Sequence, residues 1–370
     1  MSAAARLRRL AVPPARAGVR AALRVRTLRW APGSRLFVVG DGGGWSVDED
    51  ARHTAAAAGR LGFRLGPPRW ARFTGGQGVF HASHFAALER PWLDSSHALG
   101  AAWLHGRPGT EGHPEFDRAF ETLARNPERF AALQVTHEEM RRLVLDAGVP
   151  AERVHRVPIG IDLESFPLRR SGERDLARAS LGLPREAFVV GSFQKDGVGW
   201  GEGLEPKLVK GPDVLLRTLG LLRERAPDLL VLLTGPARGF VREGLDRLAI
   251  PHIHLVAETR GDLARAYRAL DAYVVASRQE GGPKAALEAM ASGVPLVSTR
   301  VGQVPELGDG AAWLVDVEDA EGLAEGLARV REGDDTTRVT VARGREVAER
   351  HALALLDPLW APVLDALARR

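Results

Sequence analysis

Two glutamates stand eight residues apart on either side of a glycine turn, in the segment SRQEGGPKAALEAMASGVPLVS at 277–298. The glycines at 281–282 leave their backbone amides uncovered, and Pro283 suits the first position of a helix, whose positive amino end favours a phosphate. Carboxylates accept paired hydrogen bonds well, so we expect Glu280 to bind the hydroxyl groups of a sugar and Glu288 those of a ribose. The spacing therefore predicts a site for a nucleotide sugar.

The use of lysine sets a second group of residues apart. Of the 51 lysines and arginines in the chain, four are lysines. Lys195, Lys207 and Lys210 lie in one long glycine-rich loop at 194–211, and Lys284 follows the glycine turn. A compact ammonium group suits a diphosphate, which helices starting near Pro212 and Pro283 would also favour at their amino ends. The alternative is a chance cluster of surface lysines.

A glycine-rich loop also follows the first apolar run, in VVGDGGGWSVDEDA at 38–51. Gly40 and Gly42 fit part of the dinucleotide fingerprint G-x-G-x-x-G, but Trp45 stands in place of the third glycine. A nicotinamide cofactor is therefore not expected.

The residues after this loop carry the pattern of a helix start. The segment at 46–49 has the form of a capping box, so we expect a helix from Ser46 with the amides of Gly43 and Gly44 just before it, as further contacts to a donor phosphate. The acids at 48–50 match the D-x-D pattern of some metal-holding sugar-nucleotide enzymes, but acids in a first turn also complement the helix dipole. We favour the second interpretation and expect no metal.

Histidines are placed at the ends of two apolar runs. His105, in WLHGRPG, precedes a glycine and can point into a cleft from the carboxyl end of a strand. His81 and His84, in VFHASH, are interpreted as structural or rim residues.

Short apolar runs alternate with helical stretches along the chain. This pattern predicts the strands and helices that position these residues. Strands are expected at 35–40, 78–83, 98–106 and 130–136, and in a second series at 187–193, 228–235, 251–256, 271–277, 294–299 and 311–316. Such alternation predicts two parallel α/β domains, with the ligand at the carboxyl ends of the strands, in a cleft between the two sheets.

We divide the chain into four parts on this pattern: a basic leader at 1–33, an amino-terminal domain at 34–165, a carboxyl-terminal domain at 166–345, and a helical segment at 346–370 that packs back on the first domain.

Composition narrows the class of protein. The 370 residues include no cysteine, which excludes disulfides, thiolate nucleophiles and cysteine zinc sites, and no apolar run is long enough to span a membrane. Every charged residue among the first 40 is an arginine, so this segment is either a disordered tail or an amphipathic helix on anionic lipid. Aromatic residues are not interleaved with these arginines, so no nucleic-acid partner is expected. A cytoplasmic protein, peripheral on the inner face of a membrane, fits this composition.

At these residues the sequence resembles a known family, the retaining glycosyltransferases of the GT-B type, family four or "group one". The segment SRQEGGPKAALEAMASGVPLVSTRVGQVPEL resembles the E-x(7)-E motif of that family and the helix after it. VHRVPIGIDLESF resembles its interdomain segment, and WLHG its cleft histidine. The resemblance implies a GT-B fold, in which two Rossmann-like domains face a central cleft.

The resemblance also assigns roles. Glu280 contacts the donor sugar, Glu288 the ribose and Lys210 the diphosphate, while His105 orients the donor sugar. The family's phosphate arginine is absent at 192–193, where Lys195 or Lys207 would substitute. The candidate residues are, for catalysis, His105, Glu280 and Lys210, and for donor binding, Gly43, Gly44, Lys195, Lys207, Gly281, Gly282, Pro283, Lys284 and Glu288.

The reaction implied is transfer of a hexose, with retention, from a UDP- or GDP-linked sugar to a glycan or lipid-linked acceptor, without metal or cofactor. Two alternatives stay open: a nucleotide-sugar epimerase of the same fold, and a non-catalytic protein that binds a nucleotide sugar.

Overall fold

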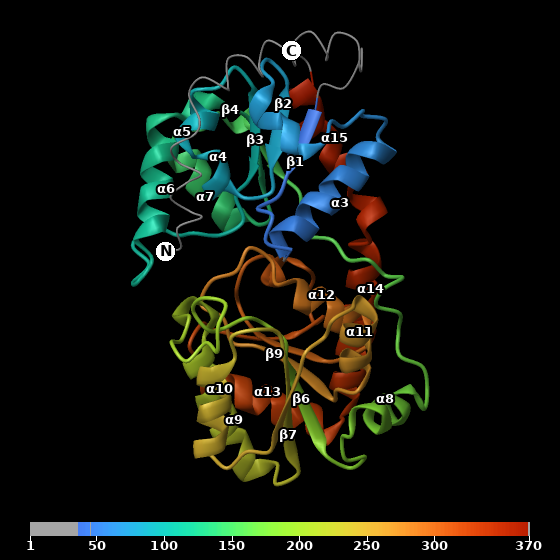
Figure 1. Cartoon of the computed structure of the whole chain (residues 1–370). Helices are drawn as coiled ribbons and strands as arrows, with labels where there is room; N and C mark the ends of the chain where they lie inside the picture. Colours follow the sequence, from blue (N-terminus) through green and yellow to red (C-terminus); the bar gives the residue numbers. More distant parts are fainter. Residues whose placement is uncertain (1–35, 45, 369–370) are drawn as a thin grey trace. The chain divides into compact units, whose positions relative to one another are not determined.

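The computed structural model describes residues 36–44 and 46–368, so the predicted leader lies outside the described residues. The described residues form two compact units: one runs up to Val157 and resumes at Leu356, and the other is Pro158–Leu355 (Figure 1). The boundary between the two units lies at 157/158, before the expected boundary at 165/166, because the segment that follows Val157 is hydrogen-bonded to the second unit. The amide of Ile159 donates to Gln303 Oε1 at 2.7 Å, and that of Ile161 to the carbonyl of His351 at 2.9 Å.

The first unit is built on a parallel sheet in which each strand pairs with the next along the chain. Its strands are β1 (Leu36–Val39), β2 (Gly78–His81), β3 (Ala98–Ala102), β4 (Phe130–Val135) and β5 (Val154–Arg156). The helices of this unit that precede the second unit in the sequence are α3 (Ser46–Arg60), α4 (His84–Ala87), α5 (Arg90–Leu93), α6 (Pro114–Arg125) and α7 (Glu138–Asp146). Strand β5 was not predicted, because Val154 is the one apolar residue in its three-residue span.

The last helix, α15 (Asp357–Ala368), completes the core of this first unit. Trp360 packs edge-to-face on Phe80, with ring centroids 5.4 Å apart. A Cβ on Gly78 would lie 2.5 Å from the carbonyl oxygen of Leu367, so the helix approaches β2 as closely as glycine permits. Residues far apart in the sequence thus share one apolar core.

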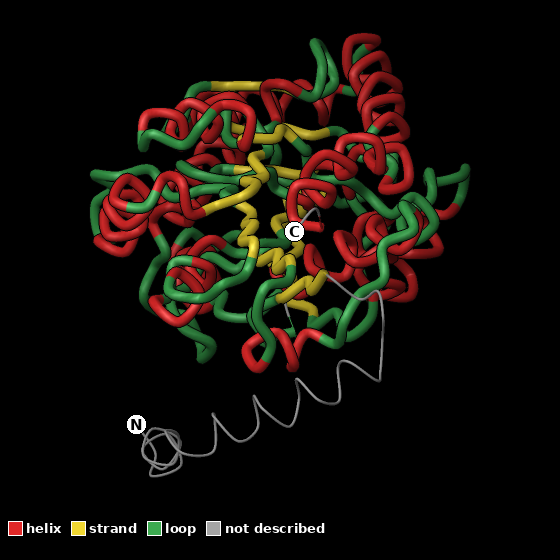
Figure 2. The backbone as a smooth tube through the Cα atoms, turned by 90° about the horizontal axis from the view of Figure 1, so that it is seen from above, coloured by secondary structure: helices red, strands yellow, loops and turns green. Residues whose placement is uncertain are grey.

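The second unit holds a six-stranded parallel sheet in the order β11-β10-β9-β6-β7-β8. The strands are β6 (Phe188–Ser192), β7 (Leu229–Thr234), β8 (His252–Leu255), β9 (Ala272–Val275), β10 (Leu296–Thr299) and β11 (Trp313–Val315). The helices are α8 (Glu173–Leu181), α9 (Pro212–Arg225), α10 (Gly239–Arg247), α11 (Arg260–Arg268), α12 (Lys284–Ala291), α13 (Ala320–Glu332) and α14 (Asp335–Arg350). All six strands coincide with expected ones, and both sheets lie among helices in the view from above (Figure 2).

The strand order of this second sheet reverses between β6 and β9, which pair in parallel through Val190 and Gly191. At such a reversal the helices that follow the two strands leave toward opposite faces, and a crevice opens outside the carboxyl ends. The loops after β6 and after β9 line that crevice. The strand order of the sheet therefore indicates a ligand site at the segments 193–211 and 276–283.

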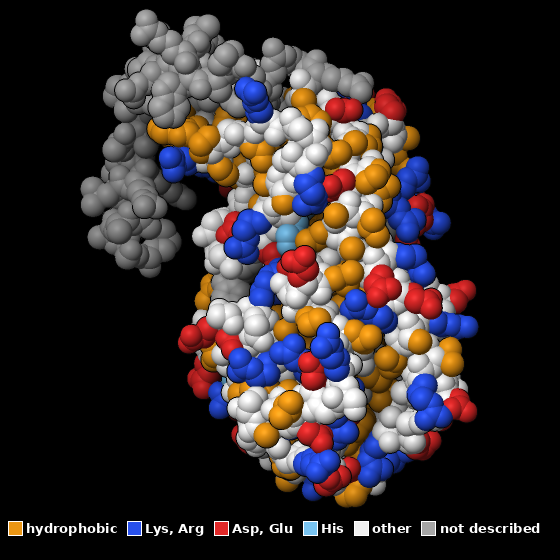
Figure 3. Space-filling model, turned by 90° about the vertical axis from the view of Figure 1, so that its right-hand side faces the viewer, with side chains coloured by type: hydrophobic (Ala, Val, Ile, Leu, Met, Phe, Trp, Pro, Cys, Tyr) orange, Lys and Arg blue, Asp and Glu red, His pale blue; other side chains and the backbone are white. Residues whose placement is uncertain are grey.

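Arginines on the surface of the second unit are repeatedly neutralised by carboxylates. Examples are Arg225 with Glu325, Arg278 with Asp213, and Arg331 with Asp228. On the face shown in Figure 3, basic and acidic side chains are interspersed. Among the described residues, no helix is long and apolar enough to cross a membrane.

Candidate functional site

Lys210 and Glu280 form an ion pair at the reversal point of the second sheet. Lys210 ends a short 3-10 helix, Leu208–Lys210, directly before α9, and its Nζ donates to Glu280 Oε2 at 2.6 Å. The other carboxylate oxygen of Glu280 accepts from Ser277 Oγ at 2.9 Å. The exposed fractions of the two side chains are 24% and 10%, so the pair is largely shielded from solvent. Two residues predicted to share a site are therefore in direct contact.

Close packing between the two loops holds this pair together. Gly211 has a positive φ of 62°, and a Cβ there would lie 1.9 Å from the carbonyl oxygen of Ala276. Gln194 joins the same loops, because its Nε2 donates to the carbonyl of Lys210 at 2.9 Å and its Oε1 accepts from Ser277 Oγ at 3.2 Å. The glycine after Lys210 is required by this close approach.

The glycine turn rests on the loop that follows β10. Gly302 has a φ of 54°, and a Cβ there would lie 2.8 Å from the carbonyl oxygen of Glu280. A Cβ on Gly282 would lie 2.7 Å from Gln303 Cδ. Helix α12 begins at Lys284 with Pro283 as its N-cap, so the expected proline in the first helical position was wrong by one residue. The turn itself lies at the helix start, as expected for an anion site.

Glu288 lies in the second turn of α12, and Tyr267 OH donates to its Oε2 at 2.8 Å. Burial raises the pKa of Glu288, while the hydroxyl of Tyr267 acts in the opposite direction. Phe193 packs against Tyr267, with centroids 4.8 Å apart, and its amide donates to Tyr273 OH at 3.0 Å. Phe193, one of the two residues in place of the family arginine, thus joins an aromatic cluster beside Glu288.

The two remaining lysines of the loop belong to a small hairpin. Gly197 and Pro206 form an antiparallel bridge, and the amide of Lys207 donates to the carbonyl of Asp196 at 2.8 Å. Lys195 Nζ lies 4.4 Å from the centroid of the Trp200 ring, and burial lowers the pKa of Lys195. The ammonium of Lys195 is thus engaged in a cation–π contact.

A buried arginine that sequence reasoning missed reaches the end of β6. Arg238 donates to the carbonyl of Ser192 at 2.6 Å and lies 3.0 Å from Asp196 Oδ1, with both ionic side chains fully buried. Burial lowers the pKa of Arg238 and raises that of Asp196, while each charge favours the other. Arg238 anchors the hairpin from the neighbourhood where the family's arginine was expected. No sequence signal connects it with Ser192, 46 positions earlier.

The glycine loop of the first unit bonds to its own carboxylates. Helix α3 begins at Ser46, as expected, and Asp48 accepts from the amides of Gly42 at 2.9 Å and Gly44 at 2.6 Å. Gly43 donates to Asp41 at 3.0 Å. Burial acts to raise the pKa of Asp48, but the amide bonds outweigh it and hold that pKa below its usual value. A phosphate at Gly43 and Gly44 would therefore have to displace carboxylates.

Acidic residues and histidines do not gather into a metal site in the described parts of either unit, where no group of three or more is placed to hold a metal ion. The carboxylate of Asp48 accepts hydrogen bonds from amides of the glycine loop, which is a structural role for an acid at a helix start.

The candidate His105 and the two histidines expected to be structural or rim residues, His81 and His84, have different surroundings. His105 follows β3, is partly buried, and lies 5.8 Å from the ring of Phe116. His84 is buried and stacks on Trp103 at 4.1 Å, and burial lowers its pKa well below the ordinary value. Burial lowers the pKa of His81 to about 3. His81 and His84 are therefore neutral core residues, and His105 is the accessible one.

The chain resembles known proteins in both sequence and fold. A family model described as "Glycosyl transferases group 1" matches residues 201–332, which include Lys210, Glu280 and Glu288. Two solved structures share the GT-B fold. Anabaena HepE in complex with UDP and glucose has a TM-score of 0.70 at 16% identity, covering 90% of this chain and 100% of that one. Sucrose-phosphate synthase from Thermosynechococcus elongatus has a TM-score of 0.71 at 17% identity, covering 90% and 98%.

Sequence relatives identify the family. A D-inositol 3-phosphate glycosyltransferase of Catenulispora acidiphila is 31% identical over 80% of this chain and 72% of its own length. One of Saccharomonospora viridis is 33% identical over 62% of this chain and 54% of its own length. The chain thus spans between about half and three quarters of the length of these relatives. On this similarity, the chain belongs to the group 1 glycosyltransferase family.

Proposed function

We propose that this chain is a retaining glycosyltransferase that moves a hexose from a nucleotide diphosphate sugar to an acceptor hydroxyl without a metal ion. The observation that carries the proposal is the Lys210–Glu280 contact of 2.6 Å at the reversal point of the second sheet, with Glu288 on the helix that follows. Two adjoining loops of one crevice supply the cation, Lys210, and the carboxylate for the sugar, Glu280, and the following helix supplies Glu288 for the ribose.

The pair supplies the two charges that the reaction needs. A bound diphosphate attracts the Lys210 ammonium, which stabilises negative charge on the leaving group in a shielded site. Glu280, released from Lys210, accepts hydrogen bonds from the sugar hydroxyls. The acceptor oxygen attacks the anomeric carbon from the face of the leaving group, and a β-phosphate oxygen takes the proton of the acceptor. Glu288 holds the ribose, and His105 orients the donor sugar.

UDP-glucose is the first donor to test, because a structural neighbour binds UDP with glucose and UDP-glucose. GDP-linked sugars are the second choice. For the acceptor, glycan and lipid-linked alcohols remain our proposal, and D-inositol 3-phosphate joins the panel because the relatives' names include it.

The arginine-rich segment at 1–30 is proposed to bind anionic lipid, which would place the enzyme on the inner face of a membrane. Deleting residues 1–30 should then abolish sedimentation with phosphatidylserine-containing vesicles while donor binding persists. Equal sedimentation of the full and the shortened chain would refute this part.

The deciding experiment joins a thermal-shift panel of UDP, GDP, ADP and dTDP with a transfer assay. A ligand that binds the folded state alone raises the melting temperature, so one diphosphate should give a selective shift. NMR of the product should then show the anomeric configuration of the donor, in EDTA as without it. An isomerised donor in the absence of any acceptor would indicate an epimerase instead. Binding without turnover on any acceptor would indicate a binding protein.

A further inference from the structure

A second cavity lies at the opposite edge of the same sheet from Lys210 and Glu280. Phe188 is the first residue of β6, Asp271 directly precedes β9, and Pro295 directly precedes β10, so these lining residues mark the amino ends of three strands. The cavity has a volume of about 350 Å³ and belongs to the second unit alone. This volume is at the small end of the range for small-molecule sites.

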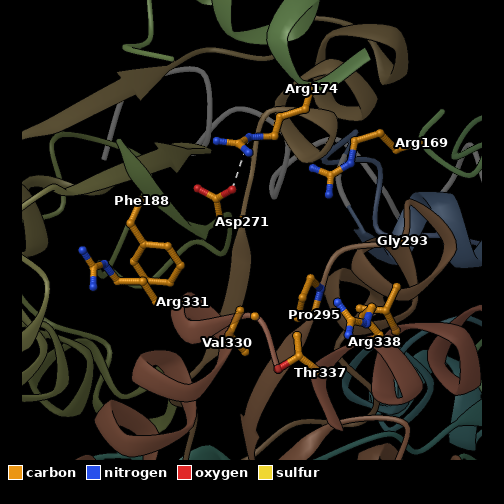
Figure 4. Close-up of a pocket in the computed structure, with 12 residues that line it drawn as sticks. Arg169, Arg174, Phe188, Asp271, Gly293, Pro295, Val330, Arg331, Thr337 and Arg338 are labelled. Atoms are coloured by element: carbon orange, nitrogen blue, oxygen red, sulfur yellow. Dashed lines mark ion pairs between the residues drawn. The ribbon is translucent and has the colours of Figure 1, made fainter. Parts of the chain in front are cut away.

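Cationic side chains outnumber acidic ones in the lining. Four arginines line the cavity, namely Arg169, Arg174, Arg331 and Arg338, whereas Asp271 is the one carboxylate in the lining. Figure 4 shows the guanidinium groups of Arg169 and Arg174 extending toward the middle of the cavity from one side, with Val330 and Pro295 across from them. The arrangement favours an anion at the centre.

Neighbouring carboxylates neutralise this charge incompletely. Asp271 is shared, because its Oδ2 lies 2.5 Å from the buried Arg178 and its Oδ1 lies 3.3 Å from Arg174 Nε, at an angle too poor for a hydrogen bond. Arg331 pairs with Asp228 and Arg338 with Asp335. The group therefore sets five guanidinium ions against three carboxylates.

Arg169 is the member of the group that makes its hydrogen bonds to backbone oxygens, while the charge of Asp271 acts on it from a longer distance. Its Nη1 donates to two carbonyl oxygens, of Arg268 at 3.1 Å and of Leu270 at 2.6 Å. Among the described residues, no carboxylate lies within ion-pair distance of Arg169. Those two carbonyls fix one edge of the guanidinium and leave its remaining N–H donors to face the cavity, in the bidentate geometry that suits a phosphate.

We propose that this cavity is a second ligand site, which takes a small organic phosphate monoester. A phosphomonoester carries close to two negative charges at neutral pH, which balances the excess of guanidinium groups. Arg169 and Arg174 bind the phosphate, and the apolar side chains of Phe188, Val330 and Val341 contact the organic part. The proposal does not depend on the donor site, because the two sites lie at opposite edges of the sheet.

The test is calorimetric titration of the full chain with glucose 6-phosphate at low ionic strength, with glucose as the neutral control. Arg169→Gln removes the charge, and Val341→Trp fills the cavity without changing any charge. Arg247→Gln is the matched control, since Arg247 is exposed on α10 and outside the lining. Lys210→Ala tests whether the ligand sits in the donor site instead. Melting temperatures establish that each variant is folded.

We expect binding that weakens with added salt, falls roughly tenfold or more in Arg169→Gln and Val341→Trp, and persists in Arg247→Gln and Lys210→Ala. Should Arg169→Gln fail to fold, Val341→Trp decides alone. The proposal is overturned by no binding in the wild type at millimolar ligand, by equal binding in Val341→Trp, or by loss of binding in Lys210→Ala.

Discussion

Lys210 Nζ donates a 2.6 Å hydrogen bond to Glu280 Oε2 although the two residues are 70 positions apart in the chain. The carboxylate thus occupies the position beside the ammonium that a phosphate oxygen would take. A ligand that brings its own anion and its own hydroxyl groups can replace both halves of the contact at once, since Lys210 gains the phosphate and Glu280 gains the hydroxyls. The charges of Lys210 and Glu280 therefore neutralise each other before the donor arrives.

Removing either partner should abolish transfer without unfolding the chain. We expect Lys210→Ala and Glu280→Ala each to lower kcat/KM by about a hundredfold or more, because each variant loses a charge that acts in the transition state. The loss of stability should be about 1–3 kcal/mol, since each variant leaves one largely shielded polar group without its partner. Steady-state kinetics and thermal melts measure both quantities. Full activity in either variant would refute the site, and Glu186→Gln, at an exposed glutamate, is the control.

Glycine at position 211 should be required for close approach and not only for backbone conformation. Gly211→Ala places a Cβ against the carbonyl of Ala276, whereas a Cβ on Gly199, at a similar φ of 74°, meets no atom within 4 Å. Gly199→Ala should cost about 1–2 kcal/mol, which is the cost of a left-handed alanine. Gly211→Ala should cost several kcal/mol more in urea unfolding and weaken nucleotide binding. Equal costs for the two variants would contradict the packing argument.

Nucleotide affinity should depend on pH through Glu288. Burial raises the pKa of this carboxyl and the Tyr267 hydroxyl acts against that rise, so the ionised form that accepts ribose hydroxyls is lost, as pH falls, at a higher pH than for an ordinary glutamate. Tyr267→Phe removes the opposing bond, and the midpoint of the affinity loss should move to higher pH. Titration of UDP affinity against pH measures the shift. Tyr273→Phe, at the other tyrosine of the chain, keeps the bond to Glu288 and should leave the midpoint in place.

Acid should destabilise the first unit through His81. Burial lowers the pKa of His81 to about 3, so the folded state excludes a proton that the unfolded chain binds below its ordinary pKa. The stabilisation is complete above pH 6.5 or so and is lost at about 1.4 kcal/mol per pH unit as pH falls toward the folded value. His81→Phe should reduce the slope of unfolding free energy against pH by the contribution of one proton. The contribution of His84, whose pKa is also lowered, should remain.

Hydrogen exchange followed by mass spectrometry in β2 and β3 measures the stability of the first unit across this range. His254→Phe, in the second unit, is the control and should leave exchange in these strands unchanged. An unchanged pH slope in His81→Phe would contradict the assignment.

The strands of the second sheet, and the importance of Lys210 and Glu280, were predictable because their signals are local or compositional. Apolar runs marked every strand of the second sheet, and the rarity of lysine drew attention to Lys210 and Lys284 in an arginine-rich chain. Long-range partners carried no such signal. Arg238 is one arginine among many, and only the fold places it on Ser192. The hydrogen bond from the Gly44 amide to Asp48 likewise depends on a loop conformation that residue spacing does not predict.

Helix α15 gives the first unit an unusual order of assembly on the ribosome. Its residues Trp360, Val363, Leu364 and Leu367 are buried in the core of the first unit, yet they are synthesised after the whole of the second unit. Helix α15 can therefore cover Phe80 and the sheet of β1 to β5 only after Pro158–Leu355 has been synthesised. The part of the chain made first is thus the last to reach its native state, the reverse of the usual amino-to-carboxyl order of domain folding.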